Sequence, residues 1–311
     1  MENIIDPIPA PILEKELSPE RFVRKANNGS NLIYIVNQFN APQVVKEIGR
    51  LREITFRAAG GGTGKALDLD EYDLSDNPYE QLIVWNPEEK EIVGGYRFFP
   101  GNKADVNGTH IPSLATAHLF TFSQKFIDVY LNKTIELGRS FVQPKYQPGL
   151  NNRKGLFSLD NLWDGLGALT VLYPHINYFF GKVTMYTHFN AKARDMILYF
   201  MNFYFPDPED LISPISPLGY KTSLDDIIPL FSKEMSYKEA HAVLNQHVRA
   251  LEENIPPMVN SYMNLSPTMK TFGTCINDTF GEVEETGILV TISDIYPSKK
   301  DRHILTFKPK A

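Results

Sequence analysis

Arginine and carboxylate side chains recur in this 311-residue chain near the ends of expected strands and helices, where together they could hold a charged substrate and accept a proton from it. Arg52 lies on an expected helix, three aspartates follow in ALDLDEYD, and Arg97 lies in GGYRFF. Glu136 and Arg139 lie three apart in ELGRS, so they reach one site only if their strand bulges, which Gly138 would permit. Unrelated surface ion pairs would give the same pattern.

A glycine-rich segment, AAGGGTGKA, is the second feature that suggests chemistry. A phosphate-binding P-loop needs glycine where Ala59 stands and serine or threonine where Ala66 stands, and it follows a strand. This segment follows an expected helix instead. A mobile surface loop is therefore predicted.

Metal and thiol chemistry are not expected. The seven histidines show no HExxH or other paired metal spacing, and His241 and His247 do not share a helix face well. Cys275, the single cysteine, has no partner nearby in the sequence and is interpreted as a small buried apolar residue. One cysteine excludes an internal disulfide framework and favours a reducing, cytoplasmic compartment.

The overall charge argues against a nucleic-acid partner. Thirty-one basic and 37 acidic residues give a net charge of −6, whereas phosphate contacts need a basic face. The chain does not open with a basic segment followed by an apolar one, so no signal peptide is expected. The most lipid-like stretch, residues 165–181, is shorter than the ~20 apolar residues that span a bilayer. Peripheral contact with a membrane stays open.

Hydrophobic periodicity predicts alternating strands and helices, with a hairpin over residues 81–99. This order favours an α/β (α+β) fold with a mixed, mostly antiparallel, twisted sheet flanked by helices. The expected strands are 31–36, 81–86, 91–99, 134–142, YFFGKVTMY and 287–295, and the expected helices begin at Asn40 with Pro42, near 119, near 159, at Asn190 and at the capping box of Ser236 and Glu239.

The chain reads as one large domain with two additions. Residues 1–30 are rich in proline and charge and are expected to form an N-terminal extension that wraps the main body. Residues 207–254 are polar and contain an amphipathic helix, so they are expected to form a helical insertion. Residues 31–311 are then a single domain that contains this insertion.

Four segments in the same order, LREITFR, ALDLDEYD, QLIVWNPEEKEIVGGYRFFPG and ELGRSFVQPKY, resemble the acyl-homoserine-lactone synthases and the amino-acid N-acyltransferases that make ornithine and glycine lipids. Both are branches of the GNAT acyltransferase fold. LDNLWDGLGALTVLYPHINYFFG extends the match, and PPMVNSYMNLSPTMKTFGTCINDTFGEVEETGILVTISDI resembles the lipid-forming, hemolysin-like branch. The resemblance spans roughly residues 31–206 and 255–296.

This resemblance implies transfer of a 3-hydroxy fatty acyl chain from acyl carrier protein to the amine of an amino acid. An ammonium group cannot attack a thioester, so a base must first take its proton. Glu136 is the first choice of base, and Asp70 and Asp73 are the alternatives. A structural role in holding the fold is open for the whole cluster. By resemblance the cluster is Arg52, Asp70, Asp73, Arg97, Glu136 and Arg139.

The Gly94-Gly95 pair inside an expected strand is unusual, because glycine weakens strands and marks a bulge or a close approach. A bulge from Gly94 to Tyr96 would free backbone N–H groups for the oxyanion of the tetrahedral intermediate. No covalent acyl-enzyme and no bound cofactor are needed.

The pyrophosphate motif of coenzyme A enzymes is missing from VQPKYQPGLNNRKGLF, which favours carrier protein as the donor. A helix start near Gly155, preceded by Lys145, Arg153 and Lys154, could bind the phosphate of a phosphopantetheine arm, although a solvated loop explains the same residues. Because acyl carrier protein is acidic, a local basic patch is expected. Its candidate residues are Lys145, Arg153, Lys154, Lys182, Lys192 and Arg194.

The leading hypothesis is a cytoplasmic N-acyltransferase that forms a lyso-aminolipid on an amino acid of the glycine or ornithine class. The Phe- and Met-rich segment 190–205 could line the acyl tunnel, although core packing explains it equally. Two alternatives remain. One is a lactone-signal synthase that uses S-adenosylmethionine, and the other is a non-catalytic carrier-protein or lipid-binding module.

Overall fold

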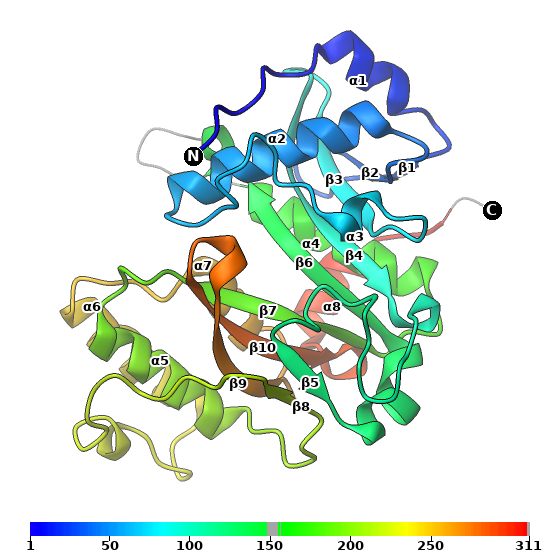
Figure 1. Cartoon of the computed structure of the whole chain (residues 1–311). Coiled ribbons are helices and arrows are strands. Elements are labelled where there is room, and N and C mark those ends of the chain that lie inside the picture. The colour runs from blue at the N-terminus through cyan, green and yellow to red at the C-terminus, as the bar shows by residue number, and fades with distance from the viewer. Residues whose placement is uncertain (148–154, 156, 310–311) are drawn as a thin grey trace.

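One twisted sheet organises the chain, whose computed structural model describes residues 1–147, 155 and 157–309 (Figure 1). Within these residues eight strands pair in one sheet, and two short strands form a second. In spatial order the large sheet contains β1 (Phe22–Lys25), β2 (Leu32–Val36), β3 (Glu80–Asn86), β4 (Glu91–Pro100), β6 (Thr134–Val142), β7 (Tyr178–Met185), β10 (Val283–Thr291) and β9 (Lys270–Asn277). The small sheet pairs β5 (Phe120–Phe122) with β8 (Ile212–Pro214).

Helices lie on both faces of the large sheet. The predicted mixed α/β architecture is therefore confirmed. The helices are α1 (Ala10–Glu16), α2 (Pro42–Ala58), α3 (Glu71–Leu74), α4 (Ser158–Leu172), α5 (Ala191–Tyr204), α6 (Tyr237–Ala250), α7 (Pro257–Met263) and α8 (Pro297–His303). None of the helices in the described part of the chain is long and apolar enough to cross a membrane.

Alternating side chains assign each sheet face to its own core. Leu82 and Tyr96 belong to the core that contains Leu166 of α4 and Met196 of α5. Ile83, the neighbour of Leu82, belongs to the core formed with α1 and α2 on the other face. The period of two in β3 therefore decides which helices each residue meets.

The strands β6 and β7 form the parallel pair of the large sheet, and they part halfway along. Their pairing begins at Thr134 opposite Tyr178 and ends at Leu137 opposite Gly181. Beyond that point β6 continues beside β4 and β7 continues beside β10. Figure 1 shows the two strands diverging from a common end. Their facing edges therefore border an open wedge in the sheet.

A bulge shapes the β6 side of this wedge, as the sequence predicted for the region of Gly138. Pairing between β4 and β6 shifts register between Gly95 and Arg97, so Tyr96 falls opposite an extra length of β6. Arg139 there has a φ of 47°, in the left-handed region that non-glycine residues rarely adopt. The bulge turns Arg139 out of the regular alternation.

The Gly94-Gly95 pair is required by the neighbouring strands and not by a ligand. A Cβ atom at Gly94 would lie 2.3 Å from the carbonyl oxygen of Phe141, and one at Gly95 would lie 2.7 Å from that of Leu82. Both approaches are too close for any side chain. The pair therefore allows β4 to sit tightly between β3 and β6.

The structure confirms some of the predicted helix starts and contradicts others. Asn190 caps α5, and Ser236 with Glu239 forms the predicted capping box of α6. The helix predicted over 119–131 is wrong at its start, because Phe120–Phe122 pair as β5 and helical turns begin only after Ser123, with Phe126–Tyr130 and Leu131–Lys133 as short helices. The expected extension contributes β1, which pairs with β2 at the sheet edge, and residues 207–254 contain β8 and α6.

The start of α2 also differs from the prediction. Asn40 does not cap it, because its side chain accepts a hydrogen bond from the backbone of Asn37. The cap comes from the end of α1, where Glu16 Oε2 accepts hydrogen bonds from the N–H groups of Gln43 and Val44 at 2.9 Å each. A carboxylate at this position satisfies free N–H groups and the helix dipole. The N-terminal segment thereby stabilises α2.

Replacing Glu16 with alanine is expected to lower the free energy of unfolding by about 1 kcal/mol, because α2 loses its cap. Urea titration followed by circular dichroism measures this. The control is Glu14→Ala on the same helix, whose side chain pairs with the exposed Lys90 and should contribute little. Equal losses in the two variants would contradict the capping role.

Candidate active site

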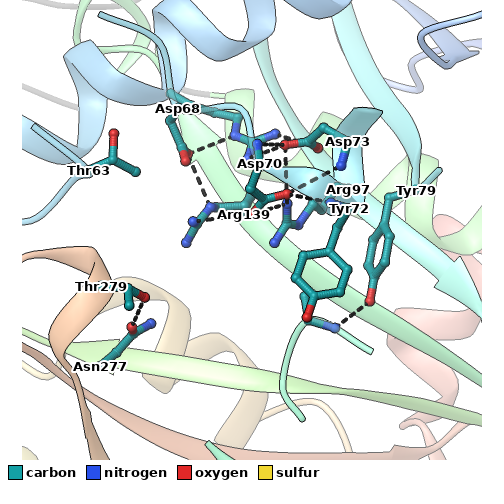
Figure 2. Close-up of polar contacts among 12 residues, drawn as sticks. Thr63, Asp68, Asp70, Tyr72, Asp73, Tyr79, Arg97, Arg139, Asn277 and Thr279 are labelled. Atoms are coloured by element: carbon teal, nitrogen blue, oxygen red, sulfur yellow. Dashed lines mark hydrogen bonds and ion pairs between the residues drawn. The ribbon is translucent and has the colours of Figure 1, made fainter. Parts of the chain in front are cut away.

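Three arginines and three aspartates form one connected cluster beside the wedge (Figure 2). Arg52 contacts Asp68 at 2.9 Å and Asp73 at 3.1 Å, and both carboxylates are fully buried with it. The other pairs are Arg97 with Asp70 at 2.7 Å, Arg97 with Asp73 at 3.2 Å, Arg139 with Asp68 at 3.1 Å and Arg139 with Asp70 at 3.7 Å. The structure thus brings together the predicted Arg52, Asp70, Asp73, Arg97 and Arg139 and adds Asp68.

The short helix α3 holds two of these carboxylates in place. Asp70 caps the helix, and the Asp73 carboxylate bonds back to the Asp70 N–H, which is a complete capping box. Gln81 of β3 donates to Asp73 at 2.9 Å. The loop before α3 is fixed because Asp68 N donates to the carbonyl of Gly49 on α2. One segment therefore connects α2 to the centre of the sheet.

Buried arginines keep these aspartates ionised. Burial alone would raise the pKa of Asp73, but Arg52 and Arg97 hold it well below its usual range. Burial is likewise outweighed at Asp68, where Arg52 and Arg139 lower the pKa. Because a carboxylate with a depressed pKa cannot readily take a proton at neutral pH, both aspartates suit a structural role better than that of a base.

Glu136, the predicted base, lies outside this cluster. Its carboxylate is fully buried, accepts hydrogen bonds from the Tyr79 hydroxyl and from the N–H groups of Ala115 and Thr116, and is not among the residues that line the cavity described below. Burial raises its pKa. Glu136 shares a sheet face with Arg97, which pairs opposite Gly138, but it lies further along β6, where Tyr79, Ala115 and Thr116 enclose it. The position of Glu136 therefore does not support the predicted contact with substrate.

A cavity of about 210 Å³ occupies the wedge between β6 and β7. Gly138 and Gly181 lie where the strands part. One side, on the face of the α4–α5 core, is apolar and carries Tyr96, Leu137, Phe179, Val183, Pro256, Pro257, Met258, Tyr262, Ile288 and Val290. The other side carries Arg139, Lys182, Thr184 and Glu285 with the rings of Phe56, Phe180, Tyr186 and Phe280.

Glu285 and Thr184 are cavity residues that the sequence reasoning missed. Glu285 is buried in the middle of β10, and its carboxylate contacts Lys182 and accepts a hydrogen bond from the Thr184 hydroxyl at 2.9 Å. The sequence carries a signal for it, because VEETGILVT places two adjacent glutamates in a strand with no other charged residue. A buried carboxylate of this kind needs a partner.

Tyr96 lines the apolar side with its side chain. Its hydroxyl lies 3.5 Å from the hydroxyl of Tyr262 on α7, and Ser140 also hydrogen-bonds to it. Burial raises the pKa of both phenols, so both stay protonated. Two hydroxyl groups are therefore available inside an otherwise apolar half of the cavity.

The predicted basic patch is not supported by the residues that the structure describes. Lys145 pairs with Glu91 and Glu89, Lys192 pairs with Asp226, Arg194 pairs with Asp195 and Glu284, and Lys182 pairs with Glu285. Arg153 and Lys154 lie outside the described residues. Gly155 packs against the carbonyl oxygens of Tyr146 and Gln147. Carboxylates therefore offset each of the four described cations.

The glycine-rich loop is held in place, in contrast to the predicted mobility. Glu53 of α2 accepts hydrogen bonds from Thr63 N at 3.0 Å, Thr63 Oγ1 at 2.7 Å and Gly64 N at 2.8 Å. Gly61 packs against Gly281, next to the Phe280 ring of the cavity. Nor do three or more histidine, cysteine or carboxylate side chains gather as a metal site in the described part of the chain.

Comparison with known proteins identifies relatives of this chain. A model of the acetyltransferase (GNAT) domain matches residues 51–153. The glycine N(alpha)-acyltransferases of Bacteroides thetaiotaomicron and Phocaeicola vulgatus are each 54% identical over 307 residues, which cover 99% of this chain and 91% and 94% of theirs. The solved N-acyl amino acid synthase FeeM is similar over 90% of this chain, with 10% identity and a TM-score of 0.35. The acyl-homoserine lactone synthase BjaI with SAM and isopentyl-CoA is similar over 53%, with 16% identity and a TM-score of 0.31.

The sheet with its parted strands, and the matching domain model, define an acyltransferase with the GNAT fold. Its two relatives at 54% identity narrow the class further: the chain belongs to the family of the glycine N(alpha)-acyltransferases.

Replacing Asp73 with asparagine is expected to lower the free energy of unfolding at pH 7 by about 3 kcal/mol, because two buried arginines lose a partner. Since the pKa of Asp73 is depressed in the folded state, its contribution is present above the ordinary aspartate pKa and is lost as pH falls below it. The variant should therefore show a weaker loss of stability below about pH 4. Urea titrations across pH 3–7 measure both effects.

The matched control is Asp76→Asn, which changes an exposed aspartate three residues away. It should leave stability and its pH dependence nearly unchanged. A loss for Asp73→Asn no larger than that of the control would contradict the role of the cluster.

Proposed function

We propose that the protein transfers a long 3-hydroxyacyl chain from the thioester of acyl carrier protein to the α-amine of glycine. The observation that carries this proposal is the cavity in the wedge, which is apolar on one sheet face and charged on the other. Glycine is chosen over ornithine because both relatives at 54% identity are glycine N(alpha)-acyltransferases. The product is a single-chain amphiphile, so the proposal includes peripheral contact with the cytoplasmic face of a membrane.

The wedge suits a phosphopantetheine arm, which carries two amide groups. Past Leu137 and Gly181, the facing edges of β6 and β7 no longer pair with each other. Unpaired strand edges present N–H and C=O groups that bind extended amides. An arm bound there would bring its thioester to the point where the apolar and charged sides meet. The missing coenzyme A motif supports carrier protein as the natural source of this arm.

The apolar side is proposed to hold the acyl chain. Each buried methylene group contributes roughly 0.8 kcal/mol, which favours a long chain over a short one. The hydroxyls of Tyr96 and Tyr262 lie within this side and could bond a hydroxyl near the thioester. They are the features of the cavity that support a hydroxylated chain.

The reaction itself requires deprotonation and an oxyanion site. The acceptor ammonium loses one proton, its nitrogen attacks the thioester carbonyl, and the C–N bond forms. As the tetrahedral intermediate collapses, the C–S bond breaks, and the thiolate takes the second proton of the nitrogen. The predicted donors at Gly94 and Gly95 lie in paired strand and do not line the cavity, so backbone N–H groups at the β6 bulge opposite Tyr96 are the proposed oxyanion donors. The cluster of Arg52 and Asp73 fixes the wall around them.

Purified protein incubated with 3-hydroxypalmitoyl carrier protein and single amino acids is expected to give N-acylglycine, detected by mass spectrometry. The same chain on coenzyme A should be a poorer donor. No acylated product with glycine, ornithine, serine or lysine would overturn the proposal. Release of methylthioadenosine from added S-adenosylmethionine would support a lactone synthase instead.

Tyr262→Phe is expected to reduce the preference for 3-hydroxypalmitoyl over palmitoyl carrier protein by roughly 10-fold, because a buried hydrogen bond to the chain is lost. Measuring kcat/KM for both donors with one enzyme preparation makes the ratio independent of the active fraction. An unchanged ratio would show that the Tyr262 hydroxyl does not bind the hydroxyl of the acyl chain.

A further inference from the structure

We propose that the ion pair of Lys182 and Glu285, together with Arg139, is the subsite that holds the amino-acid acceptor as a zwitterion. Arg139 and Lys182 bind its carboxylate, and Glu285 receives a proton from its ammonium group. The inference rests on the proposed function and adds the residues that select and activate the acceptor.

The pairing of β7 with β10 places the side chains of the ion pair on one sheet face. Glu285 lies directly opposite Thr184, and Lys182 lies two residues from Thr184 on the same strand. Side chains two apart on a strand, and those directly opposite across an antiparallel pair, share a face. Val183, between them, faces the apolar side. The charged group is therefore fixed on the opposite side of the sheet from the acyl half.

Three donors orient the Glu285 carboxylate. Oε1 contacts Lys182 Nζ and accepts from Asn277 Nδ2 at 3.3 Å, while Oε2 accepts from Thr184 Oγ1 at 2.9 Å. Each carboxylate oxygen can accept more than one hydrogen bond, so Oε2 retains capacity for an ammonium N–H. The Lys182 side chain is 14% exposed, and both residues line the cavity.

The positive charge opposite this pair comes from the bulge. The Arg139 guanidinium lies 4.0 Å from the centre of the Phe280 ring, and it lines the same cavity. Figure 2 shows Arg139 pointing toward Asn277, the residue that hydrogen-bonds to Glu285. Burial lowers the pKa of Lys182, and the charge of Arg139 lowers it further, so the two cations act on the same space.

Charge complementarity identifies the ligand class. A buried ion pair is a weak source of stability, because desolvation offsets much of its attraction. An α-amino acid carries one negative and one positive group about two bonds apart. This matches the pair of Lys182 and Glu285 with the Arg139 guanidinium on the same cavity, where Arg139 Nε also contacts Asp68 at 3.1 Å. The acceptor carboxylate would bridge Arg139 and Lys182, and its ammonium would lie beside Glu285. The glutamate oxygen takes one ammonium proton, later released to solvent, and frees the lone pair that forms the C–N bond.

Lys182→Met tests whether Lys182 binds the acceptor carboxylate, because methionine removes the charge and nearly keeps the side-chain volume. Wild type should use glycine over glycinamide, which lacks the carboxylate, and the variant should lose roughly 10- to 100-fold of this preference. KM for the acyl carrier protein donor should stay unchanged. The control is Lys270→Met, because Lys270 is 16% exposed, pairs with Glu209 and lies outside the cavity.

Glu285→Gln tests the proton acceptor. It is expected to lower kcat/KM for glycine by roughly 100-fold or more at pH 7. The loss should be smaller at higher pH, where more of the acceptor amine is already neutral in solution. Near-UV circular dichroism shows whether the variant folds. If it does not, Thr184→Val, which removes one orienting hydroxyl, carries the same test with a smaller expected loss.

An unchanged preference for glycine over glycinamide in Lys182→Met, or full activity in folded Glu285→Gln, would overturn this inference. If the wild type acylates glycine and both variants keep wild-type acceptor kinetics, the subsite is wrong but the proposed function stands. Wild type that acylates no amino acid would sink the proposed function instead.

Discussion

The parting of β6 from β7 is the constraint on which the rest of the molecule depends. Parallel strands that stayed paired would satisfy each other's backbone groups and close the sheet. After Leu137 and Gly181, β6 keeps β4 and β7 keeps β10 on their other edges, so a cavity opens between them without leaving either strand at an outer edge of the sheet. Because side chains alternate along both strands, this cavity has an apolar side and a charged side. The division follows from strand geometry alone.

The charged cluster keeps the β6 side of the wedge rigid. Arg139 adopts a left-handed conformation at the bulge, which costs free energy that surrounding contacts must offset. Asp68 and the Phe280 ring hold its side chain, while Arg52 connects Asp68 to α2. The Glu136 carboxylate also stabilises this region, because it accepts hydrogen bonds from the N–H groups of Ala115 and Thr116 and so holds their loop. The residues that the sequence predicted as catalytic therefore also stabilise the β6 side of the cavity.

Local signals in the sequence predicted much of this fold. The hairpin of β3 and β4, helix α2 and the capping residues of α5 and α6 follow from periodicity and cap chemistry within short windows. The stretch 119–131 failed because an apolar run fits a strand or a helix equally, and its partner Ile212 lies about ninety residues away. Similarly, Glu16 caps α2 from a separate helix, which no local rule detects.

The site was predicted only in part, because several of its contacts join segments that are distant in the sequence. The resemblance and the spacing brought Arg52, Arg97 and Arg139 together correctly, but Tyr79 and a loop distant in sequence enclose Glu136, although it shares a sheet face with Arg97. Lys182 and Glu285 are 103 residues apart in sequence, so only the pairing of β7 with β10 shows that they form one group. The most direct measurement of the central claim is a crystal structure with bound N-acylglycine. The acyl chain is expected along Tyr96 and Val290, with the glycine carboxylate beside Arg139. A product bound in the reverse direction, or outside the wedge, would contradict this arrangement.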